Sequence, residues 1–166
     1  PARFVLVGSG NPEEGELRPQ LLDRFGLSVE VKSPNDVAER VEVIKRRDAF
    51  EVDFDAFMAH YGAEDAKVRN TILAARKRLP KVKTPDALLS DCAALCIALG
   101  SDGLRGELTL LRTARALAAY QGDKTLTRQH LRDIAPSALS HRLRRDPLDE
   151  AGSGARVARI VDEVLE

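Results

Sequence analysis

The chain has no tryptophan, two tyrosines and five phenylalanines, so aromatic residues make up only 4% of its 166 residues. A core must therefore be built from leucine, valine, isoleucine and alanine, which favours helix packing over a large β-sandwich. An excess of charge of one sign is also absent, since Lys plus Arg and Asp plus Glu each number 26. No global field therefore attracts nucleic acid or an anionic membrane.

Only two cysteines are present, Cys92 and Cys96, and they lie four positions apart in an Ala- and Leu-rich run. If that run is a helix, both thiols point to one face. Two thiols form no disulfide framework, and a CxxxC pair lacks the further ligands of a zinc site. We therefore expect buried, reduced cysteines that pack as small hydrophobes, with a redox-responsive thiol as the alternative.

Long apolar runs are missing too, since no stretch of the sequence reaches the roughly 18 residues that span a bilayer. The chain also does not open with the charged and apolar regions of a signal peptide. Both absences predict a protein without a membrane span. We expect it in the cytoplasm, or in the chloroplast stroma if it comes from a plant or alga.

The three histidines, His60, His130 and His141, are far apart and show neither metal-ligand nor catalytic spacing. We interpret them as ordinary, partly exposed side chains and predict no metal site. Residues 12–16 hold three glutamates, which fit a solvated loop better than a Mg²⁺ site.

Two short segments near the start have the pattern of β-strands. Residues 4–7 form a continuous apolar run, as in a parallel strand buried on both faces, and residues 27–32 alternate. Two strands cannot cover the edges and faces of a parallel sheet, so partner strands are expected from a missing N-terminal half. Residues 1–33 are accordingly predicted to be the end of a larger α/β domain.

From residue 34 onward the apolar spacing is helical, which predicts an all-α domain over residues 34–166. A break between two helices is expected near Tyr61-Gly62. Thr84-Pro85 predicts a helix start, because proline is favoured at the first helical position. The expected helices cover residues 37–44, 50–60, 63–79, 84–99, 104–121, 127–139 and 157–165.

Residues 8–26, between the two strand-like segments, carry the most specific pattern. Asn11 follows the first segment, and the run Leu-Leu-Asp23-Arg24-Phe comes some ten residues later. The sequence of residues 11–26 closely resembles the I subunit of magnesium chelatase, an AAA+ ATPase. It reads Asn-Pro-Glu-Glu-Gly-Glu-Leu-Arg-Pro-Gln-Leu-Leu-Asp-Arg-Phe-Gly. The resemblance covers essentially the whole chain, including the tail at residues 139–150, and corresponds to the C-terminal portion of that subunit.

This resemblance implies a fold and a set of roles. The fold is the α/β end of an AAA+ core, with its last two strands and its arginine-finger helix, followed by an all-α lid. Asn11 is implied as sensor 1, which orients the attacking water. Arg24 is implied as an arginine finger that reaches the nucleotide of a neighbouring subunit, with Asp23 in support. Arg105, in Gly-Leu-Arg-Gly-Glu, is implied as sensor 2 on the lid, at a helix N-terminus that favours anions.

The residues alone leave plainer interpretations open. Asn11 stands before a proline, a common start of a turn. Arg24 can be a surface arginine paired with Asp23 or a glutamate. Spacing alone does not choose Arg105 over Arg112 or Arg115 on the same expected helix.

The family resemblance further implies the motor subunit of magnesium chelatase, which couples ATP hydrolysis in a ring to insertion of Mg²⁺ into protoporphyrin IX. The implied cofactors are ATP and Mg²⁺, held mainly by the missing half, because neither a Walker A loop nor a Walker B strand is present. The implied partners are further copies of the chain in a ring, expected to be a hexamer, the chelatase D subunit and the porphyrin-binding H subunit. The 166 residues alone are expected to be inactive.

A MoxR-like AAA+ chaperone and a non-hydrolysing AAA+ scaffold both remain alternatives. A DNA-translocating motor is disfavoured because neither a basic surface nor stacking aromatics are evident. Arg142, Arg144 and Arg145 form a basic cluster, but acidic residues follow at once, so we predict no nucleic-acid binding.

Overall fold

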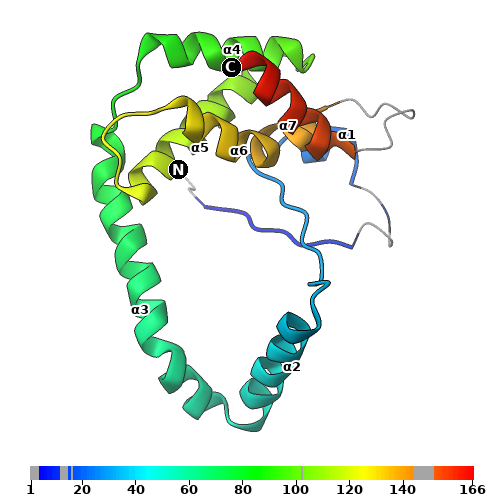
Figure 1. Ribbon diagram of the computed structural model, residues 1–166, viewed down its shortest axis with the longest axis vertical. Coiled ribbons are helices and arrows are strands. Elements are labelled where there is room, and N and C mark those ends of the chain that lie inside the picture. The colour runs from blue at the N-terminus through cyan, green and yellow to red at the C-terminus, as the bar shows by residue number, and fades with distance from the viewer. Residues whose placement is uncertain (1–3, 12–14, 16, 102, 144–151) are drawn as a thin grey trace.

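The computed structural model describes residues 4–11, 15, 17–101, 103–143 and 152–166, and it is mostly helical (Figure 1). The helices are α1 (Pro19–Leu22), α2 (Val37–Val52), α3 (Phe54–Arg78), α4 (Asp86–Ala98), α5 (Arg105–Gln121), α6 (Arg128–Leu139) and α7 (Gly152–Val164). Two short 3₁₀ turns, η2 (Leu79–Lys81) and η3 (Ser140–Arg142), follow α3 and α6. The predicted, mostly helical fold is confirmed.

Helices α4 to α7 form a bundle around one apolar core. In α4 the buried residues are Leu88, Cys92, Leu95 and Cys96, which share one face because residues three and four positions apart lie on the same side of a helix. The largest fully buried side chains are Leu95, Cys96, Leu110, Leu126, Leu131, Leu139 and Val157. Each such leucine contributes about 1.5–3 kcal/mol by leaving water.

Gly122 ends α5 as the sequence predicts. Its φ of 95° is left-handed, and its N–H donates to the carbonyl of Ala118 at the end of the helix. Glycine adopts this conformation without the strain that a Cβ would bring.

Helix α3 differs from the prediction, because it runs unbroken through Tyr61-Gly62. The break between the two helices lies at Asp53 instead, whose carboxylate accepts a hydrogen bond from the N–H of Ala56 at 2.9 Å and caps α3. One glycine inside a helix costs only about 1 kcal/mol relative to alanine. A long helix with a good N-cap absorbs that cost, so a single glycine was a poor signal for a boundary.

Helices α2 and α3 form a hairpin that extends away from the bundle (Figure 1). Neither helix buries a residue, although the C-terminal part of α3 packs against α5. Near the turn, Phe50 makes edge-to-face contacts with Phe54 and Phe57, and Tyr61 packs on Phe57. The hairpin is thus held by its own aromatic cluster.

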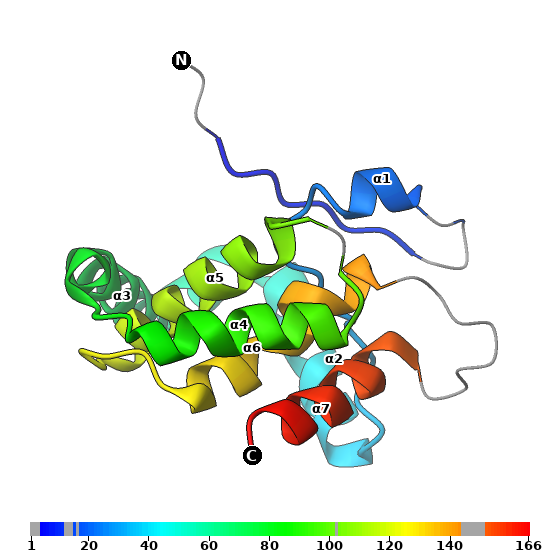
Figure 2. The same ribbon diagram turned by 90° about the horizontal axis from the view of Figure 1, so that it is seen from above.

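Figure 2 shows that the N-terminal segment and α1 lie on one side of the bundle, where α1 contacts η3. Residues 4–7 and 27–32, predicted as strands, form no strand within the described residues, and their apolar side chains are mostly exposed. A strand exists only through hydrogen bonds to a neighbour. The only β-bridge within the described residues joins Lys83 to Thr125, so these two segments have the strand pattern without a partner.

Candidate functional site

The Asp23 carboxylate joins three distant parts of the chain. Its Oδ1 accepts a hydrogen bond from Nη1 of Arg142 at 2.6 Å, and its Oδ2 is paired with Nη1 of Arg105. Asp23 directly follows α1, Arg105 opens α5, and Arg142 ends η3. We call Asp23, Arg105 and Arg142, with the neighbouring His141, the Asp23 cluster.

Arg142 is the buried member of the cluster, with a side chain only 3% exposed. Besides the carboxylate, its guanidinium donates to the carbonyls of Ala138 at 3.0 Å, Asp23 at 2.7 Å and Phe25 at 2.8 Å. A guanidinium stays charged in proteins, so its burial requires an anion and several hydrogen-bond acceptors. The arrangement supplies both.

His141 supports the same backbone. Its Nε2 lies 3.0 Å from the carbonyl of Phe25, which can only accept, so the ring carries its proton on Nε2. Burial lowers the pKa of His141 below its ordinary value of 6.5, and this outweighs the opposing effect of the bond to Phe25. The ring is therefore a neutral donor at pH 7.

The end of α6 explains why these donors and acceptors meet here. The last carbonyls of a helix have no partner inside it. In this helix the carbonyl of Ala138 accepts from Arg142, and the carbonyl of Ser137 accepts from the N–H of Ser28 at 2.9 Å. The helix end thus binds its own following turn and the segment after α1.

Arg105 is the exposed cation of the cluster, and its side chain is 55% exposed. Its position depends on Gly106, which is buried where α5 approaches α4. A Cβ at Gly106 would lie 2.9 Å from Oγ of Ser101 and 3.2 Å from Sγ of Cys96. Only glycine allows the first turn of α5 to come this close.

Arg24 lies between Asp23 and Phe25, whose carbonyls are both held by Arg142. Its backbone N–H donates to the carbonyl of Leu21 at 3.0 Å. The side chain is exposed and makes no hydrogen bond or ion pair with any described residue. The segment is therefore anchored while the guanidinium of Arg24 stays accessible.

The other candidates from the sequence lie outside the cluster. Asn11 is exposed in the segment before α1. Arg112 and Arg115 share α5 with Arg105, but neither pairs with Asp23. Of the three arginines on α5, Arg105 is the one that pairs with Asp23.

Two interpretations of basic residues need correction. Arg142 was grouped with Arg144 and Arg145 as one basic cluster, yet its side chain is buried against Asp23; the other two lie outside the described residues. His130 is 3% exposed rather than partly exposed. Its Nδ1 accepts from the N–H of Thr127 at the start of α6, and its Nε2 lies 3.0 Å from a carboxylate oxygen of Asp123.

Cys92 and Cys96 are both buried and free, as expected. Burial, with neighbouring acidic groups, raises the pKa of Cys92 to about 11 and that of Cys96 to about 12. The thiols are therefore protonated at neutral pH, and the thiolate is the reactive form.

Within the part of the chain that the structure describes, no three His, Cys, Asp or Glu side chains are grouped to hold a metal ion. The described helices also include none that is long and apolar enough to cross a membrane.

Comparison with known proteins identifies relatives of this chain. Residues 89–164, which span nearly all of the α4–α7 bundle, match the AAA lid domain. Over 165 residues the chain is 73% identical to the magnesium-chelatase 38 kDa subunit of Cereibacter sphaeroides, covering 99% of this chain and 49% of that protein. It is 44% identical to magnesium-chelatase subunit ChlI of Anabaena variabilis, with the same coverage of both chains.

A crystal structure of a Cytophaga hutchinsonii protein, provisionally assigned as an ATPase, matches 90% of this chain and 48% of its own, with a TM-score of 0.64 and 16% identity. That likeness concerns the fold alone. The chain spans about half the length of the curated relatives it matches. From the lid-domain match and the identity over nearly every residue, the chain belongs to the AAA+ family of magnesium-chelatase I subunits.

Proposed function

We propose that this chain is the lid and arginine-finger part of the ATPase motor of magnesium chelatase. The motor couples ATP hydrolysis in an AAA+ ring to insertion of Mg²⁺, the metal substrate, into protoporphyrin IX during chlorophyll or bacteriochlorophyll synthesis. One observation carries the proposal: Asp23 joins the segment of Arg24 to Arg105 on the lid. The 73% identity to a magnesium-chelatase subunit supports the choice of reaction.

Two accessible guanidinium groups fit the phosphates of ATP. Arg24 is exposed on an anchored segment, and Arg105 is exposed on the first turn of α5. Both keep their charge at any physiological pH and can contact two oxygens at once. In our proposal Arg24 stabilises the charge that develops on the γ-phosphate bound to a neighbouring subunit, Arg105 senses the nucleotide from the lid, and Asn11 orients water.

The proposed partners follow from the same family. Further copies of the subunit form the ring, for which six is the expected number. The D subunit receives the motion of the lid, and the H subunit carries the porphyrin. Bound ATP with its Mg²⁺ would be held mainly by residues outside this chain.

The main test replaces Arg24 with alanine in the complete protein. We expect a roughly 10³-fold or larger loss of kcat for ATP hydrolysis, the scale known for arginine fingers, with ATP binding largely retained. Arg69→Ala, at an exposed arginine of α3, is the matched control and should keep full activity. If binding falls in proportion to hydrolysis, the role of Arg24 on a neighbour's nucleotide is wrong.

A second test uses the 166 residues alone, mixed with Mg²⁺ and ATP. We expect no turnover; turnover that depends on Arg105 would contradict the proposal. Co-purification of the complete protein with a porphyrin-binding subunit would separate a chelatase motor from a MoxR-like chaperone.

A further inference from the structure

We propose that Arg142 is a positioning residue for ATP hydrolysis, which fixes the backbone on both sides of Arg24 to the lid. The inference rests on the proposed role of Arg24 as a finger. It assigns no contact with ATP to Arg142, which acts only through the segment that it holds.

The hydrogen bonds of Arg142 bracket Arg24. Nη1 donates to the carbonyl of Asp23 at 2.7 Å, and Nη2 donates to the carbonyl of Phe25 at 2.8 Å. The carbonyl of Phe25 also accepts from Nε2 of His141 at 3.0 Å. The carbonyls of the residues before and after Arg24 are therefore both bonded to η3, which restrains the backbone at Arg24.

Burial distinguishes Arg142 from the other arginine on Asp23. The Arg142 side chain is 3% exposed, whereas that of Arg105 is 55% exposed and that of Asp23 is 45% exposed. A buried charge that loses its anion is strongly unfavourable, while an exposed one is solvated by water. A phosphate that drew Arg105 away would therefore leave Oδ1 of Asp23 on Arg142, and the anchor would persist.

The same turn also connects to the frame of the bundle. Nε of Arg142 donates to the carbonyl of Ala138 on α6, and Ser28 is bound to the carbonyl of Ser137. Displacement of a reacting group by about 1 Å can cost on the order of 100-fold in rate. An anchor of this kind is thus sufficient to control the efficiency of a finger.

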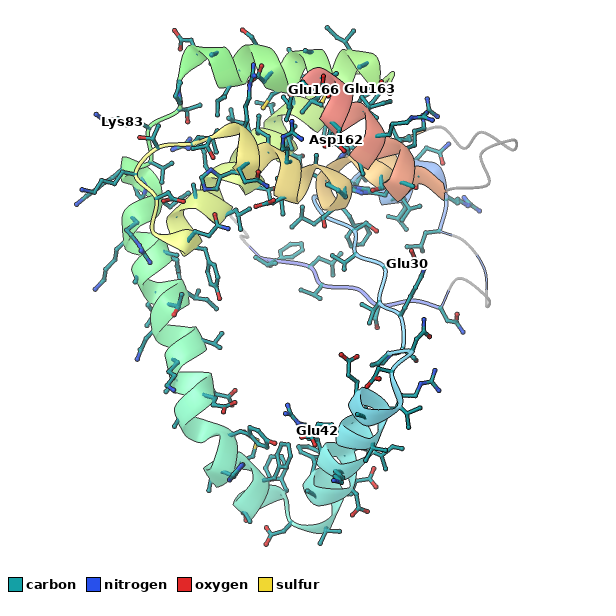
Figure 3. The ribbon with its side chains drawn as sticks, in the orientation of Figure 1. Glu30, Glu42, Lys83, Asp162, Glu163 and Glu166 are labelled. Atoms are coloured by element: carbon teal, nitrogen blue, oxygen red, sulfur yellow. The ribbon has the colours of Figure 1, made fainter. Side chains whose placement is uncertain are left out.

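The substitution Arg142→Lys in the complete protein tests this role. Lysine keeps the charge but cannot donate to two carbonyls and a carboxylate in one plane. We expect a loss of roughly 100-fold in kcat for ATP with little change in KM. Arg132→Lys is the matched control, because Arg132 lies on α6, the helix before η3. It bonds Asp162 of α7, which Figure 3 labels, and the carbonyl of Leu165 just after α7. That control should keep its kcat.

A double variant tests whether Arg142 acts through Arg24. If it does, Arg24→Ala with Arg142→Lys hydrolyses ATP no more slowly than Arg24→Ala alone. Losses that multiply would show an independent effect of Arg142 and would overturn the inference.

Hydrogen exchange gives a readout that does not depend on activity. In Arg142→Lys we expect the amides of residues 21–28 to exchange about tenfold faster or more, because bonds to a charged donor are lost. Exchange in α4 and α5 should stay unchanged. If the lysine variant does not fold, Arg142→Met, which leaves no unpaired buried charge, replaces it.

The outcomes separate this inference from the proposed function. Unchanged exchange at residues 21–28 overturns the anchor, whatever the ATPase rate. If exchange accelerates but Arg24→Ala hydrolyses ATP normally, the anchor is real and the finger role of Arg24 is wrong, so the catalytic part of the inference is overturned with it.

Discussion

The α2–α3 hairpin and the α4–α7 bundle are both helical, but they are stabilised in opposite ways. Both hairpin helices begin with an aspartate, Asp36 or Asp53, whose carboxylate accepts a backbone N–H at 2.9 Å. Helices α4 and α5 begin without a side-chain cap bond. Yet neither hairpin helix buries a residue, while the buried core of the described residues lies in and around the α4–α7 bundle.

This contrast shows that local signals determine where a helix forms, whereas packing determines whether it has a fixed place. A cap contributes about 1 kcal/mol, less than one buried leucine. The members of the Asp23 cluster come from the bundle and from the segment docked on it, and none comes from the hairpin. A site that depends on geometry therefore lies on the well-packed part of the molecule.

The largest expected effect is the loss of a core side chain. Leu131 is fully buried in α6, so Leu131→Ala should lower the free energy of unfolding by about 2–5 kcal/mol in urea denaturation. Leu73→Ala makes the same chemical change on α3, where the side chain is 47% exposed, and should cost less than about 0.5 kcal/mol. Equal losses would mean that the hairpin is packed as well as the bundle.

A second comparison uses two helical glycines. Gly106→Ala places a Cβ against Ser101 and Cys96 and should destabilise the fold by about 1–3 kcal/mol through overpacking. Gly62→Ala, with nothing within 4 Å of the new Cβ, should instead stabilise α3 by about 0.5–1 kcal/mol. Calorimetry of both variants measures the change in stability. Changes of the same sign would contradict the conclusion that Gly106 is closely packed and Gly62 is not.

The hairpin itself can be weakened at its aromatic cluster. Phe57→Leu removes the ring contacts to Phe50 and Tyr61, which are worth about 0.5–1.5 kcal/mol beyond the buried area. We expect faster hydrogen exchange at residues 50–61 and an unchanged transition for the bundle. A matching loss in the bundle would show that the two regions unfold together.

The smallest effect expected is a pH dependence at His141. Its pKa is lowered in the folded protein, so between that pKa and 6.5 the unfolded chain binds a proton that the folded chain does not. Stability should therefore fall as the pH drops below about 6.5, and His141→Gln should reduce this slope. His60→Gln, at an exposed position of the hairpin, should leave the slope in place. Urea unfolding between about pH 5 and 8, the range in which histidine changes charge, measures the slope for both variants.

Local sequence patterns predicted much of the fold. The apolar stripe through Cys92 and Leu95 predicted α4, and Gly122 predicted the end of α5, because both signals act within a few residues. The break at Tyr61-Gly62 was wrong because glycine is a weak signal inside a long helix. The strands expected at residues 4–7 and 27–32 depend on neighbours that local pattern does not supply.

The sequence by itself determined the helices of the bundle, the resemblance to a family, and Asp23, Arg24 and Arg105 as candidates. Only the tertiary structure decided that Asp23 pairs with Arg105 rather than with Arg112 or Arg115, and that the side chain of Arg142 is buried against Asp23. The physical reason is distance along the chain, since Arg142 is 119 residues from Asp23. The burial of a charge and the identity of its partner arise only when distant segments pack together.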